Sequence, residues 1–416
     1  MKIKVFLFCL SFYWFGCTEK QKIGLYPVID VVNKIDKYQR VYCSDFFSSI
    51  ELIPLETEDH CLLDIRTYPW VLLNERIILM RGNNNSQLYA FDRYGKFMKE
   101  IGKRGQGPAE YTSLLDVFFN MDKNTIYVDD FTKIIEFDFN GRFIRSFSKP
   151  HPDNKYLTKV TYAGENIFVG QVNYDGNNRF KYCLFNQNGD TVKTFPSYIF
   201  FDRAGTWVST FDGSLYPVHI DNRIYLKDYI NDTIYVIENS HLQPAFVFGF
   251  SKYSFSKERI ANPNLQSSSN HDFKIINFVG MPNYFFYNIV VPEVFSTPKS
   301  KPEYNHITNT YLPADRGVYG IFDIERNENI LLDTDNHFQK GIINDMNGGL
   351  PFIPRYYAGN NVVVDIWNVM DVLEILTDEY FSTQTIKDQQ AYKKLRDLIR
   401  NLKEDDNPIV VLAKLK

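Results

Sequence analysis

One turn motif recurs along the chain at a nearly constant interval. The sequence Phe-Asp-Arg-Tyr-Gly-Lys-Phe at 91–97 returns as Phe-Asp-Phe-Asn-Gly-Arg-Phe at 137–143, and more loosely as Phe-Asn-Gln-Asn-Gly-Asp-Thr at 185–191. The copies begin 46 and then 48 residues apart. Each predicts a β-hairpin, because a strand ends in Phe-Asp or Phe-Asn and a glycine supplies the positive φ that a tight turn needs.

The repeat predicts an all-β fold. Another strand-like segment precedes each hairpin, at Ile77–Met80, Thr125–Val128 and Asn166–Val169. A period in the forties with about four strands per unit is typical of propeller blades, which bury their faces by stacking around an axis. Three less regular units follow, at 223–237, 284–323 and 341–377, the last with a third strand predicted at Val372–Thr377. We therefore expect a six-bladed β-propeller.

The C-terminal segment has a different pattern. Residues 382–403 carry Tyr392, Leu395 and Leu398 at helical spacing, which predicts a short amphipathic helix over about 382–403. A strand is expected at about 409–413, after Asn407-Pro408. This strand, or an early one at Ile50–Leu55, is expected to complete the last blade and remove an exposed sheet edge.

The N-terminal segment is typical of an exported protein. Two lysines precede the apolar run Val5–Phe15, which ends at Gly16-Cys17 and resembles the lipobox of bacterial lipoproteins. That resemblance implies a signal peptide over 1–17 and a lipid on Cys17, which would attach the protein to a membrane. Residues 18–45 then form a predicted tether, and 46–416 a single propeller that includes the helix.

Three further segments carry a family resemblance. Ile101–Tyr111 directly follows the first hairpin, Ile53–Thr57 precedes the repeats, and Asn407–Lys414 closes the chain. Together they resemble the six-bladed, NHL-like β-propeller lipoproteins of Bacteroides-type bacteria, from about Val41 to the C-terminus. The resemblance implies an exported, outer-membrane-associated lipoprotein. It implies no particular reaction, because a fold does not give a function.

Several function classes lack support in the sequence. A formal net charge of −4 offers no basic face for nucleic acid. The seven histidines are scattered, without the His-Glu-x-x-His spacing of zinc enzymes, and no Gly-x-Ser-x-Gly elbow is present. Cys43, Cys61 and Cys183 are too widely spaced for a thiolate zinc site. Cys43 and Cys61 either form a disulfide or, like Cys183, are small buried hydrophobes.

Strand order separates the two faces of the predicted disc. The repeated short hairpins lie on one face. The connections between second and third strands, and those between blades, lie on the other, which we call the loop face. Long irregular segments gather there, as binding surfaces usually require: Arg81–Ser86, Gly102–Tyr111, Ile199–Trp207, Ser251–Asp272, Pro292–Arg316 and Asp333–Asn347.

Aromatic and basic residues in or near these segments are candidate ligand contacts. Tryptophan and tyrosine beside arginine suit sugars or peptides, although packing between blades is the more common explanation for any one such residue. The candidates are Arg104, Gln106, Glu110, Tyr111, Arg203, Trp207, Arg316, Arg355, Tyr356 and Tyr357. The expected function is a cell-envelope binding or scaffolding protein for a glycan, a peptide or a protein partner, without a cofactor.

Two alternatives remain. One is a calcium-dependent hydrolase or lyase acting at the central channel, since hard cations need several converging oxygen ligands. Its candidate ligands are aspartates that end or follow strands: Asp129, Asp130, Asp202, Asp228 and Asp365. The other is a structural subunit of an outer-membrane complex, which would expose a large apolar patch.

Overall fold

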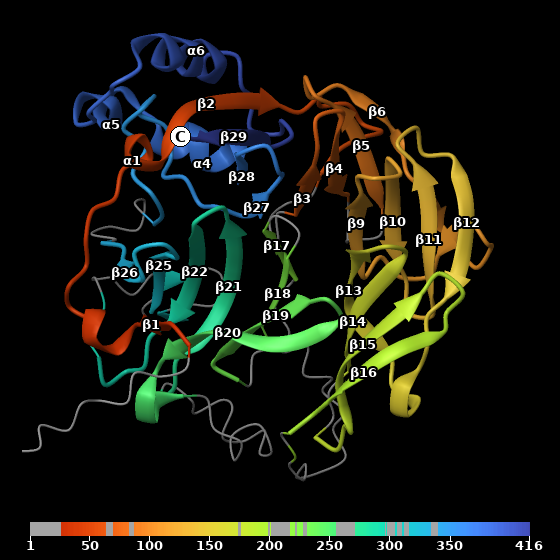
Figure 1. The fold of residues 1–416 in the computed structure, drawn as a ribbon. Coiled ribbons are helices and arrows are strands. Elements are labelled where there is room, and N and C mark those ends of the chain that lie inside the picture. The colour runs from red at the N-terminus through yellow and green to blue at the C-terminus, as the bar shows by residue number, and fades with distance from the viewer. Residues whose placement is uncertain are drawn as a thin grey trace, which may run out of the picture.

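The computed structural model describes residues 26–63, 70–82, 87–173, 176–198, 200, 217–220, 223–227, 231–254, 271–295, 297, 304–305, 310–311, 316–333 and 340–416. Within them, six antiparallel sheets, each containing four blade strands, are arranged around a central axis (Figure 1). The six-bladed propeller predicted from the repeat is therefore confirmed.

The first three blades are regular. Blade one comprises β3 (Val71–Leu73), β4 (Ile77–Arg81), β5 (Leu88–Asp92) and β6 (Phe97–Glu100). Blade two comprises β9 (Asp116–Asn120), β10 (Thr125–Asp129), β11 (Lys133–Asp138) and β12 (Phe143–Ser148). Blade three comprises β13 (Leu157–Gly164), β14 (Ile167–Val172), β15 (Phe180–Asn186) and β16 (Thr191–Pro196).

The last three blades depart from this regular pattern. Blade four comprises β17 (Val218–Ile220), β18 (Arg223–Lys227), β19 (Thr233–Glu238) and β20 (His241–Gly249). Blade five comprises β21 (Lys274–Met281), β22 (Tyr284–Val290), β25 (Gly317–Asp323) and β26 (Glu328–Leu331), with the small β23 (Tyr304–Asn305) and β24 (Thr310–Tyr311) between them in sequence. Blade six comprises β27 (Tyr356–Tyr357), β28 (Val362–Trp367), β29 (Ile409–Leu415) and β2 (Phe47–Pro54).

The repeated turns have the predicted chemistry. In the first, Asp92 Oδ1 accepts hydrogen bonds from the backbone N–H of Tyr94 (2.8 Å) and of Lys96. The φ of Gly95 is 85°, and those of Gly141 and Gly189 in the other copies are 71° and 81°. Each hairpin thus needs its glycine, because a side chain is strained at a positive φ.

The core lies between neighbouring blades, and side chains alternate in direction along each strand. In β10, Ile126 packs toward blade one and Tyr127 toward blade three. The Tyr127 ring contacts Phe168 of blade three edge to face, with 5.2 Å between centroids. The second strands are nearly continuous apolar runs because both of their faces are covered.

The ring is closed by strands from both ends of the chain. β29 pairs with β28 on one side and with β2 on the other, so both predicted closing strands are used. Asn407 fixes this junction. Its Nδ2 donates to the carbonyls of Glu56 (2.6 Å) and Cys61 (3.0 Å), and its Oδ1 accepts from the backbone N–H of Leu63.

Residues 26–46, for most of which the sequence predicted a tether, pack against the propeller. They run along the outer side of blades four to six (Figure 1). β1 (Val28–Asp30) adds a parallel fifth strand to β20. Bridges at Gln39 and Tyr42 and the short helix α1 (Cys43–Phe46) continue the path to β2. The described part of the predicted tether is therefore a structural belt.

Helical segments cover blade six, and one of them corrects a predicted strand. Residues 372–377 lie largely in α4 (Val369–Ile375), because the Asn368 side chain accepts from Met370 N and caps a helix there. α5 (Asp378–Ser382) follows. The predicted C-terminal helix is confirmed as α6 (Gln389–Ile399), which begins later than expected because Asp388 is its N-cap.

Cys43, Cys61 and Cys183 are buried free thiols, so the structure favours small buried hydrophobes over a disulfide. In the described ranges, no helix combines the length and the apolar character that a membrane span requires.

The closing strand provides a test of the fold. Ile409 is fully buried in blade six, whereas Lys414 of the same strand is exposed. We expect Ile409→Ala to lower the free energy of unfolding by about 2–5 kcal/mol, since it leaves a cavity. Lys414→Ala should change it by less than about 0.5 kcal/mol. Urea denaturation measures both, and equal losses would contradict the assigned closure.

Candidate functional site

The second strand of each blade ends on the loop face. Near this end, most of these strands carry a polar residue at the same position. Within the second strand of a blade, the second residue packs toward the preceding blade and the third residue toward the following blade. In β4 these residues are Ile78 and Leu79. The fifth residue shares the direction of the third and lies one strand out from the channel wall. In blades one to five this residue is polar, and we call these five residues the mouth ring: Arg81, Asp129, Gln171, Lys227 and Asn288.

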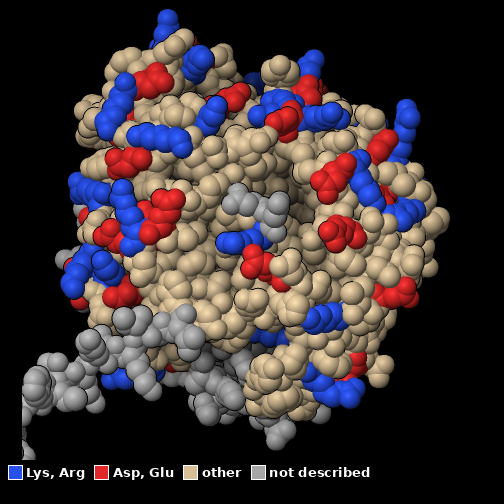
Figure 2. Space-filling view, in the orientation of Figure 1, with Lys and Arg blue, Asp and Glu red and all other residues tan. Residues whose placement is uncertain are grey.

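The inner strands extend this polar layer toward the channel. Asp116 pairs with Asp129, Thr158 with Gln171 and Asn277 with Asn288 across the first two strands of their blades. In blade six the equivalent position is Ile366. Figure 2 shows charged side chains of both signs beside the hollow at the centre of the disc.

Arg81 connects blade one to blade two at the channel mouth. Its Nη2 donates to the Leu115 carbonyl (2.9 Å) and lies 3.6 Å from Asp116 Oδ1. The guanidinium also covers the half-buried Trp70 ring, with 4.9 Å to the centroid. An aromatic ring, a cation and a carboxylate therefore meet at one point of the mouth.

Asp129 forms a fully buried ion pair with a lysine that reaches in from the outer strand. Lys149 Nζ lies 2.6 Å from Asp129 Oδ1 and donates to the carbonyl of Leu157, the first residue of blade three. Burial raises the pKa of Asp129 to about 7, although Lys149 lowers it; the charges of Asp116 and Asp130 raise it further. Removing one partner of such a pair typically costs about 3–5 kcal/mol.

Three mouth-ring residues have a buried polar atom without a hydrogen-bond partner in the described chain: Arg81 Nε, Asp129 Oδ2 and Asn288 Oδ1. Each such atom costs about 1–3 kcal/mol. Unpaired buried groups in a native fold call for an explanation, and a functional role is one.

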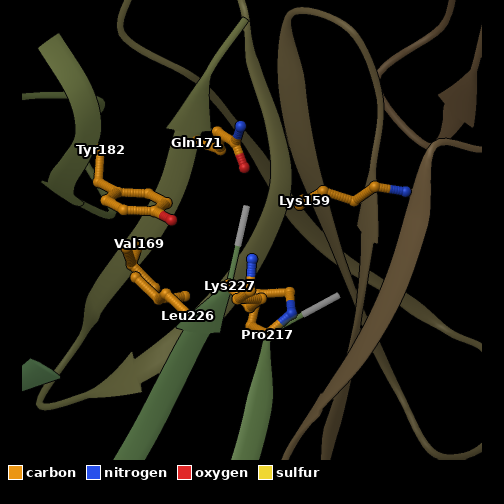
Figure 3. Close-up of a pocket in the computed structure, with 7 residues that line it drawn as sticks. All are labelled: Lys159, Val169, Gln171, Tyr182, Pro217, Leu226 and Lys227. Atoms are coloured by element: carbon orange, nitrogen blue, oxygen red, sulfur yellow. The ribbon is translucent and has the colours of Figure 1, made fainter. Parts of the chain in front are cut away.

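A recess lies between blades three and four, beside this ring (Figure 3). It encloses about 210 Å³ of empty space, counting its open mouth, over an apolar floor of Val169, Pro217 and Leu226. Gln171, Tyr182 and Lys227 turn their polar ends toward it, whereas the Lys159 side chain extends to one side (Figure 3). Lys227 is only 2% exposed. Its ammonium donates to the Asn231 carbonyl.

The channel wall next to this recess carries a histidine. His219 Nε2 lies 2.8 Å from Thr161 Oγ1 and joins the inner strands of blades four and three. The ring keeps accessible surface in the channel, yet the surrounding protein removes bulk water and lowers the pKa of His219 to about 4. The imidazole is therefore neutral at neutral pH.

The link between blades one and two contains four of the predicted ligand contacts, which differ in exposure and in their bonding partners. Arg104 of β7 (Lys103–Arg104) and Gln106 are exposed. Glu110 of β8 (Glu110–Tyr111) accepts from Gly107 N and pairs with Lys103 at 3.3 Å, and both lower its pKa. Tyr111 is 1% exposed and packs between the blades, so it is a core residue and not a surface contact.

The later predicted contacts serve the scaffold. Arg316 donates to the carbonyls of Val291, Pro292 and Phe295 and fixes the loop after β22. Arg355 pairs with Asp365 at 2.9 Å. Tyr356 and Tyr357 are half-buried in the packing of blade six. Arg203 and Trp207 lie outside the described residues.

The predicted calcium ligands do not converge where they are described. Asp129 is paired with Lys149 and Asp365 with Arg355, while Asp130 accepts from Thr112 and Ser113. Asp202 and Asp228 lie outside the described residues. Over the part of the chain that the structure describes, no group of three or more His, Cys, Asp or Glu side chains is arranged to hold a metal.

The mouth ring itself was not predicted, although the sequence contains a signal for it. The strand segments Ile77–Arg81, Thr125–Asp129 and Arg223–Lys227 each end an apolar run with a charge. Aligning the repeats on their second strands would have isolated that position, which the hairpin motif does not mark.

Residues 26–414 match the family model described as a domain of unknown function, DUF4934. No curated protein matches the chain. Solved structures with a similar fold include two crystal structures of Bacteroides proteins. A Bacteroides fragilis protein assigned as exported is 16% identical, with a TM-score of 0.64 over 94% of this chain and 99% of its own. A DUF4221 family member from Bacteroides vulgatus is 10% identical, with a TM-score of 0.51 over 89% and 97%.

An acid-range titration tests the site's electrostatics. Because burial raises the pKa of Asp129 from 3.8 to about 7, the folded state holds a proton that the unfolded chain releases above pH 4. The stability that Asp129 contributes is therefore complete below about pH 4 and lost as the pH rises toward 7. We expect the wild type to lose stability relative to Asp129→Asn over this range, measured by urea denaturation. A relative gain would mean that the ion pair outweighs burial.

Proposed function

Because the chain belongs to the DUF4934 family, which carries no assigned activity, we propose its function from the site: the protein binds an extended oligosaccharide across the channel mouth on its loop face. The observation that carries this proposal is the mouth ring, in which Arg81, Asp129 and Asn288 each leave a buried polar atom unpaired. A ligand rich in hydroxyl groups can both donate and accept, so it can pair with the Arg81 and Asn288 side chains, which keep accessible surface, whereas Asp129 is fully buried.

The types of residue at the mouth favour a sugar over a peptide. Guanidinium, carboxylate, amide and ammonium groups follow one another around the ring, and Trp70 supplies an aromatic surface. Flat polar groups beside an aromatic ring suit the hydroxyl and C–H faces of a pyranose. A peptide would rely more on apolar pockets or on a free sheet edge.

The cellular setting is part of the proposal. The fold shared with a Bacteroides fragilis protein assigned as exported supports export. The sequence before residue 26 supports a lipid on Cys17. The nine residues from Cys17 to the belt can span at most about 30 Å, so the propeller would lie close to the membrane. Metabolic labelling with palmitate should mark the wild type and not Cys17→Ala; labelling of both would refute the anchor.

A substitution of Asn288 tests ligand binding separately from folding stability. Asn288→Leu removes the unpaired Oδ1, so we expect the free energy of unfolding to stay the same or to rise by about 1 kcal/mol. The same change should weaken oligosaccharide binding at least tenfold, measured by calorimetry with a panel of neutral and acidic oligosaccharides.

Asn329→Leu is the matched control in the same blade. Asn329 is buried and fully engaged, accepting from Tyr287 Oη at 2.7 Å and donating to the Asp30 carbonyl. This variant should lose stability and keep its affinity. If Asn288→Leu keeps its affinity, the mouth ring is not the site. Peptides and calcium belong in the same panel: binding of peptides alone would contradict a sugar ligand, and stabilisation by calcium would favour the hydrolase alternative.

A further inference from the structure

Three exposed aromatic rings meet on the loop face, in a cluster that we call the aromatic platform: Phe131, His151 and Tyr156. The Phe131 and Tyr156 ring centroids lie 6.3 Å apart, and those of His151 and Tyr156 lie 5.2 Å apart. Phe131 is 48% exposed and Tyr156 is 47% exposed. Packing between blades does not account for these rings, because a ring that serves that purpose, such as Phe168, is fully buried.

The platform is continuous with the mouth ring. Phe131 comes two residues after Asp129, in the connection between β10 and β11. Tyr156 directly precedes Leu157, the first residue of blade three, whose carbonyl accepts from the buried Lys149. Both rings therefore lie at the boundary between blades two and three, on the same face as the channel mouth. An extended ligand held at the mouth can reach them.

The backbone that carries Phe131 is fixed by a buried carboxylate. Asp130 is 1% exposed, and its Oδ1 accepts from the Phe131 N–H at 2.8 Å. The same carboxylate accepts from Thr112 Oγ1 (2.7 Å) and from Ser113 N (3.1 Å) in the link between blades one and two. A ligand therefore does not have to order this turn on binding, which lowers the entropic cost of association.

The backbone between the other two rings is fixed by an arginine. Asp153 Oδ1 accepts from Arg179 Nε (2.9 Å) and Nη2 (2.7 Å). The φ values of Asp153 and Asn154 are 58° and 56°, in the left-handed region that is uncommon for residues other than glycine. Backbone strain of this kind is frequent at ligand-binding sites. Here it accompanies the turn that brings the His151 and Tyr156 rings together.

The polar atoms of the platform are open to a ligand. Within the described residues, neither the Tyr156 hydroxyl nor a ring nitrogen of His151 has a hydrogen-bond partner. The charge of Asp153, which lies between them in sequence, is compensated by Arg179. Aromatic faces beside a free hydroxyl and an imidazole suit a neutral pyranose, which presents C–H groups on its faces and hydroxyl groups at its rim.

We propose that the aromatic platform is a stacking subsite for a neutral pyranose ring of the bound oligosaccharide. The proposal rests on the function proposed above and extends the binding site from the channel mouth onto blades two and three. Tyr156 supplies the ring on which the sugar packs. The Phe131 ring is inclined by 68° to it and forms a side wall. The Tyr156 hydroxyl and His151 bind sugar hydroxyl groups.

Substitutions at the exposed rings test the subsite on the intact protein. Calorimetry with cellohexaose, xylohexaose and mannohexaose should show that at least one of these neutral sugars binds to the wild type. Tyr156→Ala should weaken that binding about tenfold, because the exposed half of a large aromatic side chain loses its contact with the ligand. Phe131→Ala should also weaken it. Tyr156→Phe keeps the ring, so it should retain most of the affinity.

Tyr94→Ala is the matched control. Tyr94 is 88% exposed and lies on the hairpin face, away from the channel mouth on the loop face. Its backbone N–H donates to an aspartate carboxylate at 2.8 Å, as that of Phe131 does. This variant should bind the sugar as the wild type does. All of the substituted rings are exposed, so each variant should fold, which circular dichroism checks.

The outcomes separate the two proposals. If Asn288→Leu weakens binding and Tyr156→Ala does not, the platform is overturned and the mouth ring stands. If only Tyr156→Ala weakens binding, the platform stands and the mouth ring is overturned. A loss in Tyr156→Phe as large as that in Tyr156→Ala overturns stacking. Binding of tri-galacturonate or of a proline-rich peptide, with none of the three neutral sugars bound, overturns the neutral pyranose.

Discussion

The pairing of β2 with β29 is the constraint on which the whole ring depends. It joins segments about 350 residues apart, as the bond from Asn407 N to Thr57 Oγ1 shows. Closing a loop of that length costs about 5 kcal/mol in chain entropy. Burying four branched aliphatic side chains at 409–412 contributes roughly 6–12 kcal/mol, so closure is favourable. The belt of residues 26–46 reinforces it by joining the outer edges of blades four to six.

In a closed ring, the same strand position of every blade lies at one level of the channel mouth. At this level the chain buries polar groups where apolar side chains would pack better. Apolar residues at the mouth ring would fold at less cost, as Ile366 does in blade six. The chain instead buries Lys149 with Asp129 and leaves three buried polar atoms unpaired. Polar groups that reduce stability at one level of a rigid scaffold are characteristic of a recognition site.

The sequence predicted the features that local chemistry determines and missed those set by contacts between blades. The glycine turns and α6 follow from patterns within a few residues, and the blade count follows from the regular spacing of those turns. Tyr111 was misjudged, because its burial depends on Phe137 of the next blade, 26 residues away. The role of Lys149 depends likewise on the start of blade three. A strand was expected at 372–377, but most of these residues are helical. The Asn368 side chain caps a helix that begins at Val369, ahead of the apolar residues that suggested a strand.

A crystal structure of the protein grown with a mixture of oligosaccharides would test the central claim most directly. The account predicts sugar density across the channel mouth on the loop face, with ligand oxygens within hydrogen-bond distance of at least one of the partly exposed Arg81, Gln171 and Asn288 side chains. Density confined to the hairpin face or to the outer edges of the blades, with the mouth ring filled only by water, would contradict it.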